Sequence, residues 1–224
     1  MGIHRCIKVA FCTLALAFSS AHAGLVIWDL NPTNTNGSVG SSAHIFTSSG
    51  YSITAYGFDR VAGPDPGHEL WFKNDIDDHG LGVTGTPHNE LQVGPDGPLQ
   101  YIQFDLGSIL SAGFTDGLLR VSSVDPGEAF DIYGSNTLGS LGTKISLGGG
   151  PYGDTNNNNF VNIPNFGSYR YVSVVAAIDD VLPWALAAHI PAIPELGGTS
   201  AAMVLLAFFG VVMATRKISA SSQR

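Results

Sequence analysis

The sequence is poor in cysteine. Its 224 residues include two, Cys6 and Cys12, and both precede the region that we expect to fold. Exported domains with a small core often add disulfides, yet from residue 24 onward this chain contains no thiol. A disulfide framework and a thiolate metal site are therefore excluded for that region, which must be held together by its apolar core or by ions.

Basic residues are also few. The chain has ten Lys and Arg against eighteen Asp and Glu, and the part from residue 24 to residue 189 has five basic and seventeen acidic residues, a net charge of −12. This charge argues against a nucleic acid or an anionic membrane surface as a partner. Two interpretations stay open: solubility at a crowded surface, or affinity for divalent cations.

Sequence signatures of catalysis are absent as well. The sequence contains no Gly-x-Ser-x-Gly elbow, no His-Glu-x-x-His pair, no P-loop and no dinucleotide fingerprint. Most acidic residues stand beside Gly, Pro or Asn, where carboxylates cap turns. A glycosidase needs two carboxylates held in a cleft, and among seventeen acidic residues the sequence singles out no pair. We therefore expect no enzymatic activity and assign no catalytic residue.

The first 23 residues have the three parts of an export signal. Arg5 and Lys8 supply positive charge, residues 9–18 form a short apolar stretch, and Ala21 and Ala23 flank His22 in the small-x-small pattern that signal peptidase cleaves. We predict a signal peptide over residues 1–23 with cleavage after Ala23. The apolar stretch is too short to span a bilayer.

The longest uncharged apolar run stands near the other end. Residues 196–215 carry no charge, and Arg216 and Lys217 follow immediately. Twenty helical residues reach ~30 Å, the thickness of the hydrocarbon core of a bilayer. We predict a transmembrane helix over 196–215, a basic cytoplasmic tail over 216–224 by the positive-inside rule, and a proline linker with a sorting motif over 190–195.

Between these ends, short β-type runs alternate with turn residues. Segments such as Gly63-Pro-Asp-Pro-Gly67 and Gly94-Pro-Asp-Gly-Pro98 are typical of turns, and no stretch has a sustained period of 3.6 residues. We predict an all-β ectodomain over residues 24–189, a β-sandwich of jelly-roll type. The expected strands are 25–29, 51–58, 70–73, 99–106, 118–124, 129–133, 144–147, 160–163, 169–177 and 184–189.

Two further expectations concern single segments. In 99–106 the residues Ile102, Phe104 and Leu106 alternate with more polar ones, which predicts one apolar and one largely polar face. Residues 31–42 are small and polar, and we expect them to be loosely structured.

One acidic turn is a candidate metal site. Asp75, Asp77 and Asp78 stand within four residues, and Glu90 follows shortly after. Ca²⁺ prefers six to eight oxygen ligands, and this turn with Glu90 supplies several. The alternatives are a solvated turn without any cofactor, and a transition-metal pair formed by His79 and His88.

The tryptophans bear on ligand binding. Trp28 and Trp71 lie in apolar runs, which predicts core packing. The position of Trp184, beside Pro183, leaves open a sugar-stacking role. A glycan-binding module on the cell surface is therefore our second hypothesis, and a secreted hydrolase is a third.

The tail resembles a known sorting signal. Pro194 and Glu195, then a single apolar span, then Arg216 and Lys217 are similar to the tail of PEP-CTERM proteins, although Leu196 stands where that class has a second proline. A tail with two glycines, Gly197-Gly198, that a rhomboid-type protease cleaves is the rival interpretation, and a permanent membrane anchor is another.

The ectodomain is also similar to one found in many exported proteins of that class, over roughly residues 70–187. The similarity rests on segments such as Tyr101-Ile-Gln-Phe-Asp-Leu106 and Gly127-Glu-Ala-Phe-Asp-Ile-Tyr-Gly-Ser-Asn136. The two resemblances imply an exported surface or matrix protein, processed by signal peptidase and by an exosortase-type membrane enzyme, and associated with extracellular polysaccharide.

Overall fold

A computed structural model describes residues 24–60, 67–75, 78–95, 97–124, 126–146, 152–153 and 159–190. For four of these, at 97, 98, 152 and 153, it describes the backbone alone. The predicted signal peptide, apolar span and basic tail lie outside the described residues. So does the predicted linker except for Ile190, which is the last residue of a strand and not part of a linker. The described residues belong to one compact unit, Ala23–Pro191.

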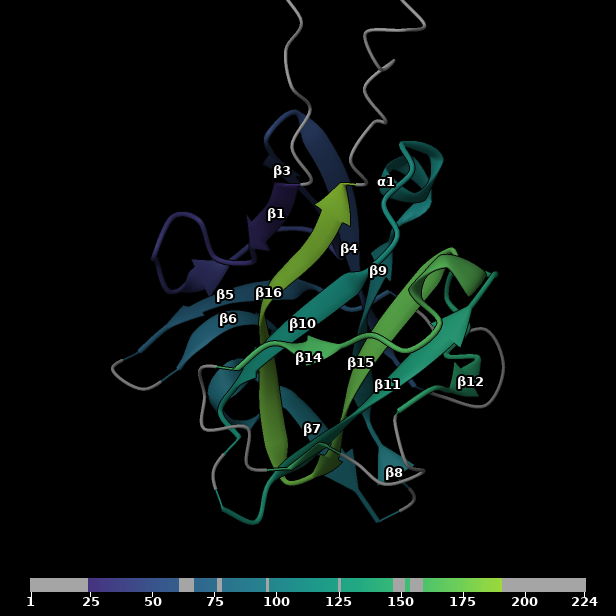
Figure 1. Ribbon diagram of the computed structural model, residues 1–224. Helices are drawn as coiled ribbons and strands as arrows, with labels where there is room; N and C mark the ends of the chain where they lie inside the picture. The colour runs from purple at the N-terminus through teal and green to yellow at the C-terminus, as the bar shows by residue number, and fades with distance from the viewer. Residues whose placement is uncertain are drawn as a thin grey trace, which may run out of the picture. The chain divides into compact units, whose positions relative to one another are not determined.

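Antiparallel strands form more than half of the described chain and helix forms very little of it, which confirms the all-β prediction (Figure 1). The strands are β1 Gly24–Asp29, β2 Gly37–Ser38, β3 Ala43–Ser48, β4 Tyr51–Asp59, β5 Leu70–Asn74, β6 His79–Val83, β7 Leu91–Gly94, β8 Gly97–Pro98, β9 Gln100–Asp105, β10 Gly117–Ser122, β11 Ala129–Ser135, β12 Thr143–Lys144, β13 Tyr152–Gly153, β14 Val161–Asn162, β15 Tyr171–Ile178 and β16 Asp180–Ile190. The described helical elements are short: α1 Gly107–Ser111 and the 3-10 turns η1 Pro87–Asn89 and η3 Phe166–Ser168.

Two larger sheets share one hydrophobic core. The first has the order β14-β10-β16-β7-β8, with β1 also paired to β16, and the second has the order β12-β11-β15-β9-β4-β3, with β13 paired to β11. Trp28 and Leu186 from the first sheet pack in the same buried cluster as Phe104 and Val174 from the second. Burial of these side chains is the main stabilising contribution to the fold.

A third, small sheet has the order β2-β5-β6. Its strand β6 lies against β16, where Gly80 has φ +155° and a Cβ there would approach the Pro183 carbonyl oxygen to 2.4 Å. Glycine at this position therefore allows the close contact that holds the β5–β6 hairpin on the first sheet.

The first and last strands are neighbours. β1 pairs antiparallel with β16, and in this register Gly24 stands opposite Ile190 (Figure 1). β16 is the longest described strand, with eleven residues, and it pairs with β10 along its other edge. The two ends of the described domain therefore lie side by side at one end of the first sheet.

Strand β9 corrects the expectation of a polar face. Ile102, Phe104 and Leu106 enter the shared core as predicted. The opposite face is also buried, because Tyr101 packs with Phe58, Leu141 and Val175 in a second apolar cluster. A loop crosses this face, and its position depends on the tertiary fold rather than on alternation within the strand.

Gln103 is a buried polar residue on the same face of β9 as Tyr101. It is fully buried, and its amide donates to the Ser140 carbonyl and the Ser173 hydroxyl while its oxygen accepts from the Gly139 N–H. Its polar atoms are therefore satisfied by the crossing loop and by β15, as burial of an amide requires.

The segment 31–42 is also more ordered than its composition predicts. It contains β2, and Asn31 is fully buried, with its amide donating to the carbonyl oxygens of Thr35 and Lys73. The side chain of Asn31 thus orders this segment through hydrogen bonds to backbone carbonyl groups rather than through burial of apolar surface. Trp71 is half-buried rather than in the core, whereas Trp28 is buried as predicted.

Candidate functional site: a buried lysine among acidic side chains

The predicted metal ligands lie at and beside the β5–β6 hairpin. Asn74 stands opposite His79 in the hairpin register, and the Asp75 N–H donates to the Asp78 carbonyl at 2.8 Å. These contacts place the side chains of Asp75 and Asp78 at the tip of the hairpin. Asp77, the remaining acidic residue of the turn, lies outside the described residues.

The ammonium group of Lys73 lies among three of the predicted ligands. Its Nζ donates to Glu90 Oε1 and lies 2.9 Å from Asp78 Oδ2 and 3.9 Å from Asp75 Oδ2. Lys73 is 5% exposed and Glu90 is 1% exposed. The structure thus brings Asp75, Asp78 and Glu90 together, but around a lysine that the sequence analysis did not include.

This position of Lys73 bears on the calcium prediction. A cation already lies between the carboxylates, and Ca²⁺ at the same place would have to displace it. Calcium held by Asp75, Asp77, Asp78 and Glu90 stays a prediction, and it now requires Lys73 to move.

Burial sets the charge behaviour of the cluster. Burial raises the pKa of Glu90, the carboxylates of Asp180 and Asp78 raise it further, and the hydrogen bond from Lys73 partly offsets these effects. Burial opposes the charge on Lys73, but hydrogen bonds to Glu90 and Asp78 outweigh it and raise the pKa of the ammonium. Ser123 Oγ donates to Glu90 Oε2 at 2.9 Å and satisfies the second carboxylate oxygen.

Three more polar residues, His88, Asp180 and Gln92, extend the cluster toward the surface. Donor atoms of His88, Glu90 and Asp180 all lie within 4.8 Å of one another. His88 Nδ1 is 3.4 Å from Asp180 Oδ2, and the Gln92 amide donates to the same oxygen at 3.1 Å. The pairing of β7 with β16, in which Gln92 stands opposite Asp180, brings these residues together.

The alternative pair of His79 and His88 is not formed. His79 bonds Asn74 through Nδ1 at 3.2 Å and Asp29 through Nε2 at 3.1 Å, whereas His88 faces Asp180. The two histidines therefore have separate partners: His79 contacts Asn74 and Asp29, and His88 contacts Asp180.

Trp184 is not an open stacking surface. The Arg120 guanidinium carbon lies 3.3 Å from the centroid of the Trp184 ring, and the His79 ring lies 5.1 Å from it. A sugar ring stacks on an aromatic face that is free. Because Arg120 covers a face of Trp184, the half-exposed indole has a packing role in this structure.

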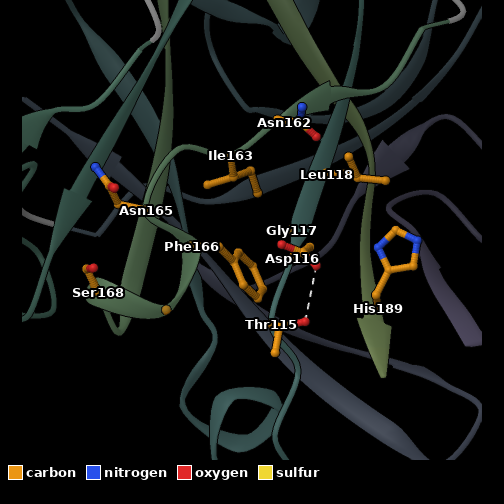
Figure 2. A pocket seen from close by; sticks show the side chains of 11 residues that line it. Thr115, Asp116, Gly117, Leu118, Asn162, Ile163, Asn165, Phe166, Ser168 and His189 are labelled. Atoms are coloured by element: carbon orange, nitrogen blue, oxygen red, sulfur yellow. Dashed lines mark hydrogen bonds between the residues drawn. The ribbon is translucent and has the colours of Figure 1, made fainter. Parts of the chain in front are cut away.

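A separate pocket of about 490 Å³ lies where β10, β14, η3 and the end of β16 meet (Figure 2). The buried ring of Phe166 forms part of its wall, against Gly117. Polar side chains surround it, and one of them, His189, has a buried Nδ1 without a hydrogen-bond partner in the described chain. The polar lining residues are Thr115, Asp116, Asn162, Asn165, Ser168 and His189.

The other predicted site residues cannot be placed. Ala21 and Ala23 of the signal cleavage motif, Pro194 and Glu195 of the sorting motif, and the basic residues Arg216 and Lys217 all lie outside the described residues. Among the residues that the structure does describe, no helix has the length and apolar character needed to cross a membrane.

Sequence reasoning missed three residues of the cluster: Lys73, Ser123 and Asp180. For Lys73 a signal was present, because a lysine that ends an apolar strand directly before an acidic turn is placed to pair with it. Ser123 and Asp180 carry no such signal, since they reach Glu90 and His88 through strand pairing between distant segments.

Comparison of the chain with protein families, with curated proteins and with solved structures gives no match in any of the three.

Proposed function

We propose that this chain is a non-enzymatic exported protein of the cell surface or extracellular matrix, associated with extracellular polysaccharide. It is sorted through its C-terminal tail, which resembles a PEP-CTERM signal, and processed by signal peptidase and an exosortase-type enzyme. The two larger sheets form a β-sandwich of jelly-roll type in this proposal.

The pairing of Gly24 with Ile190 is the observation that carries the proposal. Cleavage after Ala23 would leave Gly24 as the first residue, already paired at the edge of the first sheet. The sorting motif would follow Ile190 within a few residues. A domain whose two ends meet in this way is released from the signal peptide and held by its tail without any rearrangement of its strands.

The absence of cysteine after Cys12 is consistent with export in this form. The domain is held by the apolar core that the two sheets share, and it needs no disulfide chemistry outside the cell. No catalytic residue and no resident cofactor are part of the proposal.

The tail motif is tested by a double substitution. We expect Pro194→Ala with Glu195→Ala to block processing, so that the chain stays in the membrane fraction with residues 217–224 attached. The matched control is Pro191→Ala, which changes a proline of the same linker outside the motif and should leave processing intact. Mass spectrometry of both termini in membrane and surface fractions measures the outcome.

Two results would count against the proposal. Peptides from residues 217–224 on the surface-located wild-type protein would indicate a permanent anchor, and peptides from residues 1–12 on the mature protein would indicate a retained signal.

Glycan binding is a second candidate function, favoured by the pocket of Figure 2. Carboxylate, amide and hydroxyl groups beside an aromatic wall suit a ligand rich in hydroxyl groups. We expect Asp116→Asn to weaken binding on an array of bacterial polysaccharides, with Asp179→Asn as a control for lost charge, because asparagine tolerates the left-handed backbone of position 179. Equal signals from both variants and the wild type would exclude the pocket.

A further inference from the structure

The group of His88, Glu90 and Asp180 has the composition and spacing of a small metal site. It combines one imidazole nitrogen with two carboxylates, and its donor atoms lie within 4.8 Å of one another. Tetrahedral Zn²⁺ holds its ligands at ~2.0–2.2 Å, which places neighbouring ligand atoms roughly 3.4 Å apart. His88 Nδ1 and Asp180 Oδ2 lie 3.4 Å apart already.

The backbone holds His88 in this position at some cost. His88 and Asn89 both have left-handed conformations, with φ of 61° and 59°. For a histidine this conformation is unfavourable by ~1–2 kcal/mol unless its surroundings fix it, whereas asparagine tolerates it. Here Thr86 Oγ1 donates to the Glu90 carbonyl at 2.8 Å, and the Asn89 carbonyl packs on Gly82, where a Cβ would approach it to 1.9 Å.

Charge favours a cation beside Glu90. Three carboxylates, those of Asp78, Glu90 and Asp180, act on one another in this region, and Lys73 provides a single positive charge among them. Glu90 Oε1 accepts from Lys73 and Oε2 accepts from Ser123, and each carboxylate oxygen keeps a further lone pair for a cation. Asp180 and His88 add a second carboxylate and a nitrogen ligand within reach of these oxygens.

We propose that His88, Glu90 and Asp180 bind a divalent cation of the zinc type, with water completing its coordination. The nitrogen ligand and the small number of donors favour Zn²⁺ over Ca²⁺, which prefers six to eight oxygens. The bound ion joins η1 to the start of β16 and offsets the unfavourable backbone of His88. This site differs from the predicted calcium turn, with which it shares Glu90.

The test uses the purified full-length chain, first treated with a chelator and then titrated with ZnCl₂ or with CaCl₂ in separate calorimetric experiments. We expect Zn²⁺ to bind and to raise the melting temperature by linkage. Loss of one ligand in His88→Asn or Asp180→Asn should weaken Zn²⁺ binding at least tenfold. Both variants should fold. In His88→Asn, asparagine tolerates the left-handed backbone. In Asp180→Asn, the side-chain oxygen of asparagine can still accept the hydrogen bond from Gln92.

The matched control is Asp179→Asn, which removes an equal charge from the exposed neighbour of Asp180 and should bind Zn²⁺ as the wild type does. The proposal is overturned if the wild type does not bind Zn²⁺, or if His88→Asn and Asp180→Asn bind it within twofold of the wild type. It is equally overturned if Asp179→Asn weakens binding as much as Asp180→Asn, or if Ca²⁺ binds more tightly than Zn²⁺ and is unaffected by His88→Asn.

Discussion

Replacement of Lys73 by Met gives a direct measure of the buried charge cluster. The change keeps an apolar stem of similar length and removes the ammonium that Glu90 and Asp78 contact. Because Glu90 is 1% exposed, the substitution leaves a buried carboxylate without its cation. Removal of one partner from a buried ion pair destabilises a protein by ~3–5 kcal/mol.

This loss should be visible in thermal unfolding. For a domain of this size each kcal/mol changes the melting temperature by about 2–4 °C, so we expect Lys73→Met to lower it by roughly 6–20 °C. Trp28 is 1% exposed, and tryptophan fluorescence therefore reports the opening of the core. Denaturant titration followed by this fluorescence gives the free energy of unfolding of the full chain at pH 7.

Two further variants make the interpretation specific. Lys144→Met removes a lysine whose side chain is 34% exposed and pairs with Asp131 at 2.8 Å. Its partner Asp131 is buried but keeps a hydrogen bond from Ser146, and the lysine itself reaches solvent, so we expect Lys144→Met to cost less than Lys73→Met. Combining Lys73→Met with Glu90→Leu should recover much of the lost stability, because the fully buried carboxylate is removed together with its cation. The carboxylate of Asp78 also loses Lys73, but its side chain is 25% exposed and reaches water.

The outcome that refutes the reasoning is a loss of less than ~1 kcal/mol in Lys73→Met, equal to that in Lys144→Met. The same variant tests the calcium prediction. With the ammonium removed, Asp75, Asp78 and Glu90 have room for a divalent cation, and millimolar Ca²⁺ should raise the melting temperature of Lys73→Met more than that of the wild type. An equal response of the two proteins would mean that Lys73 does not compete with calcium.

Three other predictions follow from individual contacts. Burial lowers the pKa of His44, which packs against Phe46 at 4.7 Å between ring centroids, so the folded state binds fewer protons than the unfolded state as the pH falls below the ordinary value of 6.5. The free energy of unfolding should therefore fall between pH 7.5 and pH 5, and it should fall less in His44→Gln. Denaturant unfolding at both pH values measures the difference. Gly117→Ala places a Cβ 1.9 Å from the buried Phe166 ring and should lower the free energy of unfolding by ~1–3 kcal/mol. The loss should be smaller when Phe166→Leu is also present, and a neutral effect of Gly117→Ala would contradict this packing. A reductant should leave the melting temperature of the mature protein unchanged, because no cysteine follows position 12; a shift on reduction would mean that the N-terminal segment is retained.

The class of fold was predictable because its signals are local. Turn residues separate the apolar runs throughout the ectodomain, and alternation within a run reports which side chains share a face. Trp28 and Phe104 were assigned to the core on this basis, and both are buried. Strands with few apolar side chains gave no such signal: β3 contains His, Thr and Ser, and β6 contains two glycines.

The candidate site depended on contacts between distant segments. The acidic turn, Glu90 and a lysine directly before the turn were all visible in the sequence, but the burial of Lys73 against Glu90 depends on the packed β5–β6 hairpin. Asp180 meets His88 and Gln92 because β7 pairs with β16, although nearly the whole of the second half of the domain separates them in the chain. Pairing between such distant strands is favoured by the apolar surface that both sheets bury together, and no single segment reveals it.

By itself the sequence determined the all-β class, the absence of disulfide chemistry and the negative charge of the domain, since each follows from composition or from local periodicity. Only the tertiary structure decided that a lysine lies among the predicted calcium ligands, that Arg120 covers Trp184 and that Gly24 stands opposite Ile190. Two of these features, the contact of Arg120 with Trp184 and the pairing of Gly24 with Ile190, join residues that are far apart in the chain. Lys73 and its acidic partners are closer in the chain, but their burial depends on how the hairpin packs on the domain. In all three cases the free energy comes from the shared core rather than from any of the segments alone.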